Sequence, residues 1–102
     1  MGYTPTPKTV LTTDAFARWF ERLGDKTVRA RIEARLRRLE LGHFGDVKPV
    51  GEGVSELRIA IGPGYRIYLA PKGLEIVVLM AGGDKSSQAR DIETALALAR
   101  QI

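Results

Sequence analysis

The residues best suited to chemistry gather in one stretch, "ELRIAIGPGYRIYLA", residues 56–70. Arg58, Arg66 and Tyr68 alternate there with aliphatic residues, as they would on one face of two strands. A guanidinium presents a rigid fork of donors that matches a phosphate group. A tyrosine can stack on a nucleobase or relay a proton through its hydroxyl. The stretch therefore predicts a site that binds a phosphodiester.

The aliphatic pattern also predicts how these two strands pair across a Gly-Pro-Gly turn. An antiparallel register that sets Ile61 opposite Tyr65 places every aliphatic side chain of the two strands on one face. The same register sets Arg58 opposite Tyr68, with Arg66 diagonal to them on the other face. The alternative interpretation is that Arg58 and Tyr68 are a cross-strand packing pair without a chemical role.

A second device for binding an anion follows in "GGDKSSQ", residues 82–88. We interpret Gly82 and Gly83 as part of a flexible loop whose backbone N–H groups are exposed just before a helix. A helix N-terminus attracts negative charge, and Lys85 adds a cation beside it. The alternative is that the two glycines only form a tight turn.

Cleavage of RNA through its 2′-hydroxyl needs a proton acceptor as well as cations that stabilise the phosphate. The sequence offers no obvious strong base, which predicts an enzyme that is slow by itself or that needs a partner to align the RNA. His43 is the single histidine, and we interpret it as a bystander in a loop. The chain has no cysteine, which excludes disulfides, zinc–thiolate sites and a cysteine nucleophile.

The composition is that of one soluble domain spanning residues 1–102, with 44% hydrophobic and 27% charged residues. No apolar run reaches the roughly 18 residues of a membrane-spanning helix, and the N-terminal residues lack the apolar segment of a secretory signal. We therefore expect a cytoplasmic protein without a membrane partner.

Lysines and arginines number 16 against 12 acids, a net charge of +4. This balance favours nucleic acid or an acidic protein as partner, although it also suits an ordinary soluble surface.

Helical periodicity marks three further segments, after a loose arm at 1–7 and a short edge strand at 9–11. The first helix, with its caps over 12–24, carries its apolar stripe on Phe16, Trp19, Phe20 and Leu23. The second, with its caps over 25–42, carries its stripe on Val28, Ile32, Leu36 and Leu39. The last helix, over 87–102, carries its stripe on Ala89, Ile92, Leu96 and Ala99.

The remaining segments complete an α+β architecture. Residues 43–54 are expected to form a loop leading into a short strand, and "LEIVVLM" at 74–80 a central strand covered on both faces. The element order is then β-α-α-β-β-β-α, a helical hairpin packed on a mostly antiparallel twisted sheet with a C-terminal helix. The second helix also bears five arginines, which could contact phosphates or could simply form a solvated face.

Three motifs together, E-L-R, G-P-G-Y-R-I-Y and G-G-D-K-S-S-Q, resemble the RelE/ParE superfamily of bacterial type II toxins. The resemblance covers residues 9–101 and is greatest to the HigB-like, phage Gp49-related branch of addiction-module killer proteins. It implies a RelE-like single domain, a cognate antitoxin that forms a hetero-oligomer with the toxin on operator DNA, and cleavage of mRNA on the ribosome. It implies neither a metal nor a cofactor.

The resemblance also implies roles for particular residues. The expected catalytic residues are Arg58, Arg66, Tyr68 and Lys85. The expected RNA-binding residues are Lys48, Tyr65 and Gly83. Residues 86–102 contain no counterpart of the C-terminal catalytic tyrosine of RelE, and the histidine pair of some HigB toxins is absent, so the general base and acid stay open. Two other functions also stay open: a ParE-like toxin that binds DNA gyrase without cutting RNA, and an inert binding module.

Overall fold

The computed structural model describes residues 6–102, so most of the predicted arm at 1–7 lies outside the described residues. The elements in chain order are β1 (Thr9–Thr12), α1 (Asp14–Arg22), α2 (Lys26–Glu40), β2 (Val47–Gly51), β3 (Val54–Ile59), β4 (Tyr65–Lys72), β5 (Ile76–Asp84), the 3₁₀ turn η1 (Lys85–Ser87) and α3 (Gln88–Ala99). The predicted α+β class is confirmed. Residues 43–54, expected to be mostly loop, also contain the additional strand β2.

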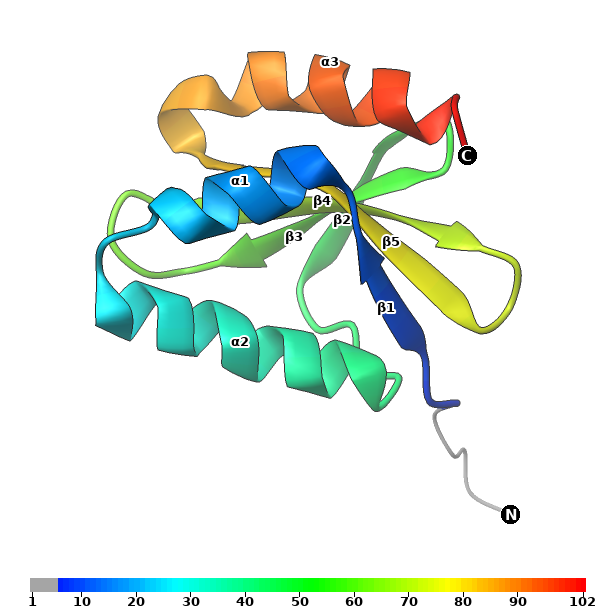
Figure 1. Cartoon of the computed structure of the whole chain (residues 1–102), viewed down its shortest axis with the longest axis horizontal. Helices are drawn as coiled ribbons and strands as arrows, with labels where there is room; N and C mark the ends of the chain where they lie inside the picture. The colour runs from blue at the N-terminus through cyan, green and yellow to red at the C-terminus, as the bar shows by residue number, and fades with distance from the viewer. Residues whose placement is uncertain (1–5) are drawn as a thin grey trace.

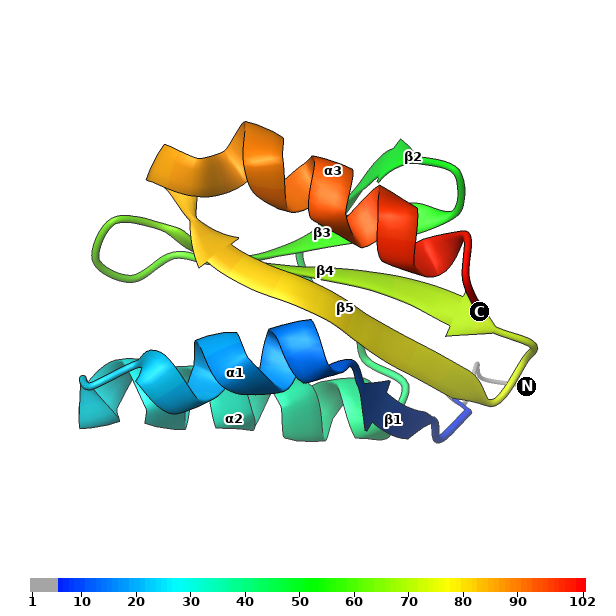
Figure 2. The same ribbon diagram turned by 45° about the horizontal axis from the view of Figure 1, so that its top comes forward.

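The sheet is covered by helices on both faces. Its strand order is β1-β5-β4-β3-β2, with β1 parallel to β5 and every other pair antiparallel (Figure 1). Figure 2 shows α1 and α2 together below the sheet and α3 above it. The predicted edge strand and the predicted central strand are β1 and β5. In residues 6–102, no helix combines the length and apolar character that crossing a membrane requires.

Each covered face has its own apolar core. The α1–α2 side is built on the buried residues Phe16, Val28, Ile32, Leu39, Leu57, Ile59, Ile67, Leu69, Val77 and Leu79. The α3 side is built on Val54, Tyr68, Ala70, Val78, Met80, Ala81 and Ala95. The predicted stripes of the first two helices are therefore confirmed. The stripe of the last helix is wrong at Ala89, which is exposed, because the helix turns Ala95 into the core instead.

Local sequence explains where the first two helices begin. The hydroxyl of Thr13 accepts a hydrogen bond from the Phe16 N–H at 3.1 Å, and the carboxylate of Asp25 accepts from the N–H groups of Thr27 and Val28. Both are N-caps, which satisfy donors that a helix start leaves without partners. The two caps therefore set the residues at which α1 and α2 begin.

The predicted register between β3 and β4 is wrong by two residues. Tyr65 pairs with Ile59 instead of Ile61, and Arg58 therefore faces Arg66 instead of Tyr68. The reason is the connection: β3 ends at Ile59, and a five-residue loop at 60–64 replaces the expected tight turn. A shift of two residues leaves every side chain on its predicted face, so the aliphatic face is still the buried one.

The predicted loop at Gly82 and Gly83 is also wrong, because both residues belong to strand β5. A Cβ atom at Gly82 would overlap the Trp19 ring. A Cβ atom at Gly83 would overlap the Asp91 carboxylate and the Ser87 hydroxyl on the other face. The two glycines therefore let α1 and the start of α3 approach the strand closely from opposite sides.

This close approach predicts that Gly82→Ala destabilises the protein. Inserting a methyl group into a packed site costs about 1–3 kcal/mol, and Trp19 blocks the space that the methyl would need. The matched control is Gly24→Ala, since Gly24 is exposed and a Cβ atom there would have no other atom within 4 Å. Urea unfolding of both variants measures the free energies. Equal stabilities of the two variants would contradict the packing role of Gly82.

Candidate anion-binding site

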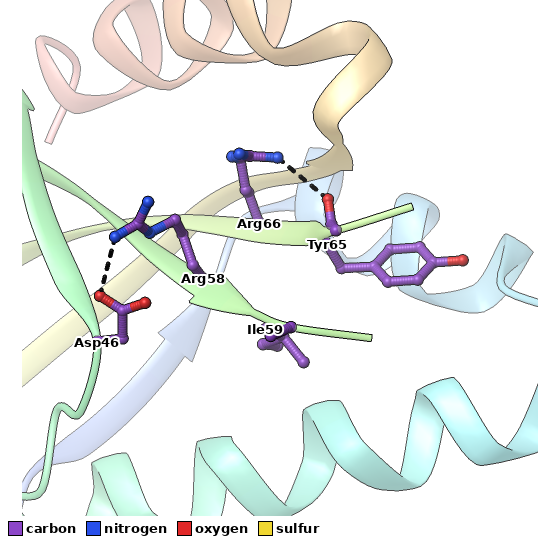
Figure 3. Close-up of a pocket in the computed structure, with 7 residues that line it drawn as sticks. Asp46, Arg58, Ile59, Tyr65 and Arg66 are labelled. Atoms are coloured by element: carbon purple, nitrogen blue, oxygen red, sulfur yellow. Dashed lines mark hydrogen bonds and ion pairs between the residues drawn. The ribbon is translucent and has the colours of Figure 1, made fainter. Parts of the chain in front are cut away.

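A hollow of about 330 Å³ opens at the end of the sheet where β3 and β4 are joined; we call it the sheet-end hollow. Its lining residues are Asp46, Arg58, Ile59, Ala60, Gly64, Tyr65 and Arg66. Figure 3 shows Arg58 and Arg66 projecting from neighbouring strands, with Arg58 directed toward Asp46. The hollow therefore joins two guanidinium groups and one carboxylate.

The two arginines are direct cross-strand partners. Side chains in such positions begin about 5 Å apart, and like charges there repel one another. Each arginine has its own carboxylate: Arg58 Nη2 lies 3.2 Å from Asp46 Oδ1, and Arg66 Nε lies 2.8 Å from Glu56 Oε1. The two carboxylates offset the repulsion between the guanidinium groups.

The two ion pairs differ in their exposure to solvent. The side chains of Arg58 and Asp46 are 46% and 59% exposed, whereas those of Arg66 and Glu56 are 13% and 3% exposed. An exposed pair contributes about 0–1 kcal/mol, so an incoming anion can displace Asp46 from Arg58 at little cost. Removing one partner of a buried pair is far more costly. Arg58 is thus the exchangeable cation and Arg66 the fixed one.

Further contacts hold Arg66 and Glu56 in place. Arg66 Nη1 donates to the Gly64 carbonyl at 3.1 Å, and Glu56 Oε1 accepts from Gln88 Nε2 at 2.8 Å. The Arg66 Nε–H is not aligned for a hydrogen bond with Glu56, so their contact is an ion pair. Since Gln88 begins α3, this network ties the helix to the sheet beneath it.

Tyr68 lies on the same face of the sheet as Arg58 and Arg66 but is completely buried. Its hydroxyl has no hydrogen-bond partner in the described part of the chain. Burial, together with the carboxylates of Glu56 and Asp91, raises the pKa of Tyr68 to about 12. A covered ring offers no face for stacking a nucleobase, and a phenol that holds its proton so tightly is a weak source of protons. In this structure Tyr68 acts as a core residue.

Two of the other expected site residues do not line the hollow. Lys85 is exposed at the first position of η1, after the end of β5. Lys48 is exposed on β2, opposite Glu56 in the register. Both cations lie outside the lining of the sheet-end hollow.

The expected RNA-binding residues Tyr65 and Gly83 have different surroundings. Tyr65 lines the hollow, and its ring lies 6.5 Å from that of Trp19 between centroids. Gly83 is buried opposite Arg66 in the sheet, under the start of α3. Of the seven expected residues, the hollow brings together Arg58, Arg66 and Tyr65.

Comparison with known proteins shows a relative of high similarity. A protein of Haemophilus influenzae, described as an uncharacterized protein, is 45% identical to this chain over 95 residues, which is 93% of each of the two chains. This chain belongs to the same family. No family model matches the sequence. The similarity to the Haemophilus influenzae protein extends over nearly the whole length of both chains.

Sequence reasoning missed the two carboxylates, Asp46 and Glu56. Glu56 could have been found, because it lies two residues before Arg58 in the same strand and the two side chains therefore share one face of the sheet. Asp46 carried no comparable signal. It reaches Arg58 because β2 pairs with β3, and the Arg58 N–H donates to the Asp46 carbonyl at 3.1 Å.

The exposed ion pair predicts that Asp46→Asn strengthens anion binding. The change frees Arg58, and loss of a competing pair worth about 1 kcal/mol raises affinity by up to roughly fivefold. Fluorescence anisotropy with a short, non-cleavable 2′-O-methyl RNA measures the affinity. Glu93→Gln is the control, because it removes one exposed negative charge outside the hollow. An affinity gain of the same size in both variants would show that only net charge matters.

The buried phenol predicts a pH dependence of stability. The pKa of Tyr68 is raised from 10 to about 12 in the folded protein, so its contribution is complete below about pH 10 and is lost as the pH rises toward 12. Tyr68→Phe keeps the ring and removes the titrating group. Urea unfolding from pH 9 to 12 should therefore show a smaller loss of stability for the variant than for the wild type. Parallel curves would contradict this assignment.

Proposed function

We propose that this chain is the toxin of a type II toxin–antitoxin system, similar to the HigB-like branch of the RelE/ParE superfamily, and that it cuts mRNA on the ribosome. The observation that carries the proposal is the cross-strand pair of Arg58 and Arg66 in one hollow. Two guanidinium groups facing one space suit the charge that develops on a phosphodiester during cleavage. The sequence resemblance points to the same function.

In the proposed reaction, the RNA 2′-hydroxyl attacks the neighbouring phosphorus atom. The new O2′–P bond forms as the P–O5′ bond breaks, which leaves a 2′,3′-cyclic phosphate and a free 5′-hydroxyl. Asp46 is the one carboxylate among the lining residues of the hollow, and we propose that it accepts the proton of the attacking hydroxyl. The departing 5′-oxygen takes a proton from water. Arg58 and Arg66 bind the phosphate oxygens throughout.

The ribosome is needed in this proposal because the hollow is open and its carboxylate is exposed. Such a group accepts a proton efficiently only when the 2′-hydroxyl, phosphorus and leaving oxygen are held in line. The ribosome holds mRNA in a defined conformation, and the toxin supplies the cations and the carboxylate. We therefore expect little cleavage of free RNA.

The antitoxin of the proposal is a small protein that binds this chain and blocks the hollow. A partner with acidic side chains could replace the phosphate at Arg58, since the net charge of the chain is +4. We expect the pair to form a hetero-oligomer on operator DNA. Co-expression with an adjacently encoded small protein should suppress growth inhibition. A chain that is harmless when expressed alone would contradict the toxin assignment.

A second candidate is a ParE-like toxin that binds DNA gyrase. The burial of Tyr68 favours it, because an exposed aromatic side chain for RNA is then missing at that position. Expression of the chain in bacteria distinguishes the two candidate functions. Cuts in ribosome-bound mRNA support the first, and gyrase-dependent DNA breaks with an SOS response support the second.

The RNA-cleavage proposal predicts that Arg58→Gln lowers the cleavage rate on ribosomes by about 10²-fold or more, since it removes a donor to the developing charge. Arg66→Gln alone would leave Glu56 buried without its partner. The double change Glu56→Gln/Arg66→Gln therefore tests Arg66 with both charges removed, and we expect a similar loss of rate.

The matched control for these variants is Arg37→Gln, which removes an exposed arginine of α2 outside the sheet-end hollow. It should leave cleavage within about twofold of the wild type, since surface changes away from special features cost at most roughly 0.5 kcal/mol. Urea unfolding checks that each variant is folded. Folded Arg58→Gln protein with full cleavage activity would refute the role of Arg58.

A further inference from the structure

A second hollow, of about 300 Å³, adjoins the sheet-end hollow; we call it the α2 hollow. Its lining residues are Arg31, Ala34, Arg35, Arg38, Ile59 and Ala60. Ile59 and Ala60 line both hollows. Ala60 is exposed and carries only a methyl group. An extended ligand that leaves the sheet-end hollow would therefore pass over one small side chain before it reaches α2.

The three arginines of the α2 hollow lie on one face of α2. They are spaced four and then three residues apart, so Arg31 and Arg38 are separated by about 10 Å along the helix axis. Arg35, between them, is already engaged: its Nη1 donates to the Arg58 carbonyl at 2.8 Å and its Nη2 to the Phe44 carbonyl at 3.3 Å. Arg35 therefore fixes α2 to β3.

Arg31 and Arg38 have no comparable engagement. Both are exposed, and neither side chain forms an ion pair or hydrogen bond within residues 6–102. Burial is the main cause that lowers the pKa of Arg35, and the positive charge of Arg38 lowers it further. The lining of the α2 hollow contains no acid that would offset these charges. Two exposed cations on one face of α2, with no carboxylate in the lining of the hollow, suit the binding of negative charge.

We infer that Arg31 and Arg38 form a second phosphate-binding patch, and that a single RNA strand held at Arg58 and Arg66 continues over Ala60 onto α2. The choice of RNA as ligand rests on the proposed function. The phosphates beyond the cleaved linkage would lie on this patch. It would add affinity independent of sequence, since contacts to phosphates carry no base readout.

RNA fits this surface better than an acidic protein does. Tight protein interfaces depend on large apolar or aromatic residues at their centre, whereas the apolar lining of the α2 hollow is two alanines and the edge of a buried isoleucine. A phosphate backbone needs only point charges at intervals along its path. Arg31 and Arg38 provide such charges at the two ends of a helical face.

The test measures how salt affects RNA binding. A labelled dodecamer and a dinucleotide of 2′-O-methyl RNA, neither of which can be cut through the 2′-oxygen, are titrated at several salt concentrations. Each lost phosphate contact lowers the slope of log K against log salt by about 0.7 for single strands. Arg31→Gln/Arg38→Gln should therefore lower the dodecamer slope by about 1.4 and leave dinucleotide binding unchanged. The control Arg18→Gln/Arg37→Gln removes equal charge from exposed positions outside both hollows and should change neither.

Three results would overturn the inference: a wild-type slope in Arg31→Gln/Arg38→Gln, an equal loss of slope in the control, or weakened binding of poly-glutamate with RNA binding unchanged. The last would assign the patch to an acidic protein. The probe cannot be cut, so the measurement is independent of catalysis. Ribosomal mRNA cleavage with an unchanged slope refutes this inference alone. The expected slope loss in a protein that neither cuts mRNA nor inhibits growth refutes the proposed function alone.

Discussion

The buried ion pair of Glu56 and Arg66 is the constraint on which the rest of this structure depends. It joins β3 to β4, and through Gln88 it joins both strands to the first turn of α3. Burying two charges is costly, and removal of one partner leaves an uncompensated charge that costs about 3–5 kcal/mol. The pair therefore does more to define one arrangement than to add stability. It holds the Arg66 guanidinium at the wall of the sheet-end hollow, whatever the hollow contains.

The close packing around β5 keeps this arrangement rigid. Gly82 admits the Trp19 ring on one face, and Gly83 admits Asp91 and Ser87 on the other. The start of α3 can then lie low enough for Gln88 to reach Glu56. A side chain at Gly83 would push the start of α3 away from the sheet and lengthen that contact, whereas one at Gly82 would push α1 away on the opposite face. Gly83 therefore affects the site through packing, although it does not line the hollow.

The sequence predicted what depends on periodicity and missed what depends on loop length and partner strands. The spacing of Phe16 to Leu23 was enough to place α1 on the sheet, because burial of a stripe is a local property. The alternation of aliphatic residues was not enough to predict the β3–β4 register, because a five-residue loop and a tight turn are both compatible with it. Asp46 could not be found at all, because only the pairing of β2 with β3 brings it to Arg58. The burial of Tyr68 depends on α3 covering that face, which its own strand does not encode.

The corrected register changes the chemical meaning of the site. An arginine opposite a tyrosine is an ordinary packing pair, but an arginine opposite an arginine is unfavourable unless negative charge lies between or beside them. Arg66 has a permanent, buried counter-ion in Glu56, while Arg58 shares an exposed one with solvent. An anion that replaces Asp46 therefore meets one fixed and one adaptable guanidinium. Because such an anion would bind only the folded chain, it would stabilise the fold by about 2.7 kcal/mol at a hundred times its dissociation constant.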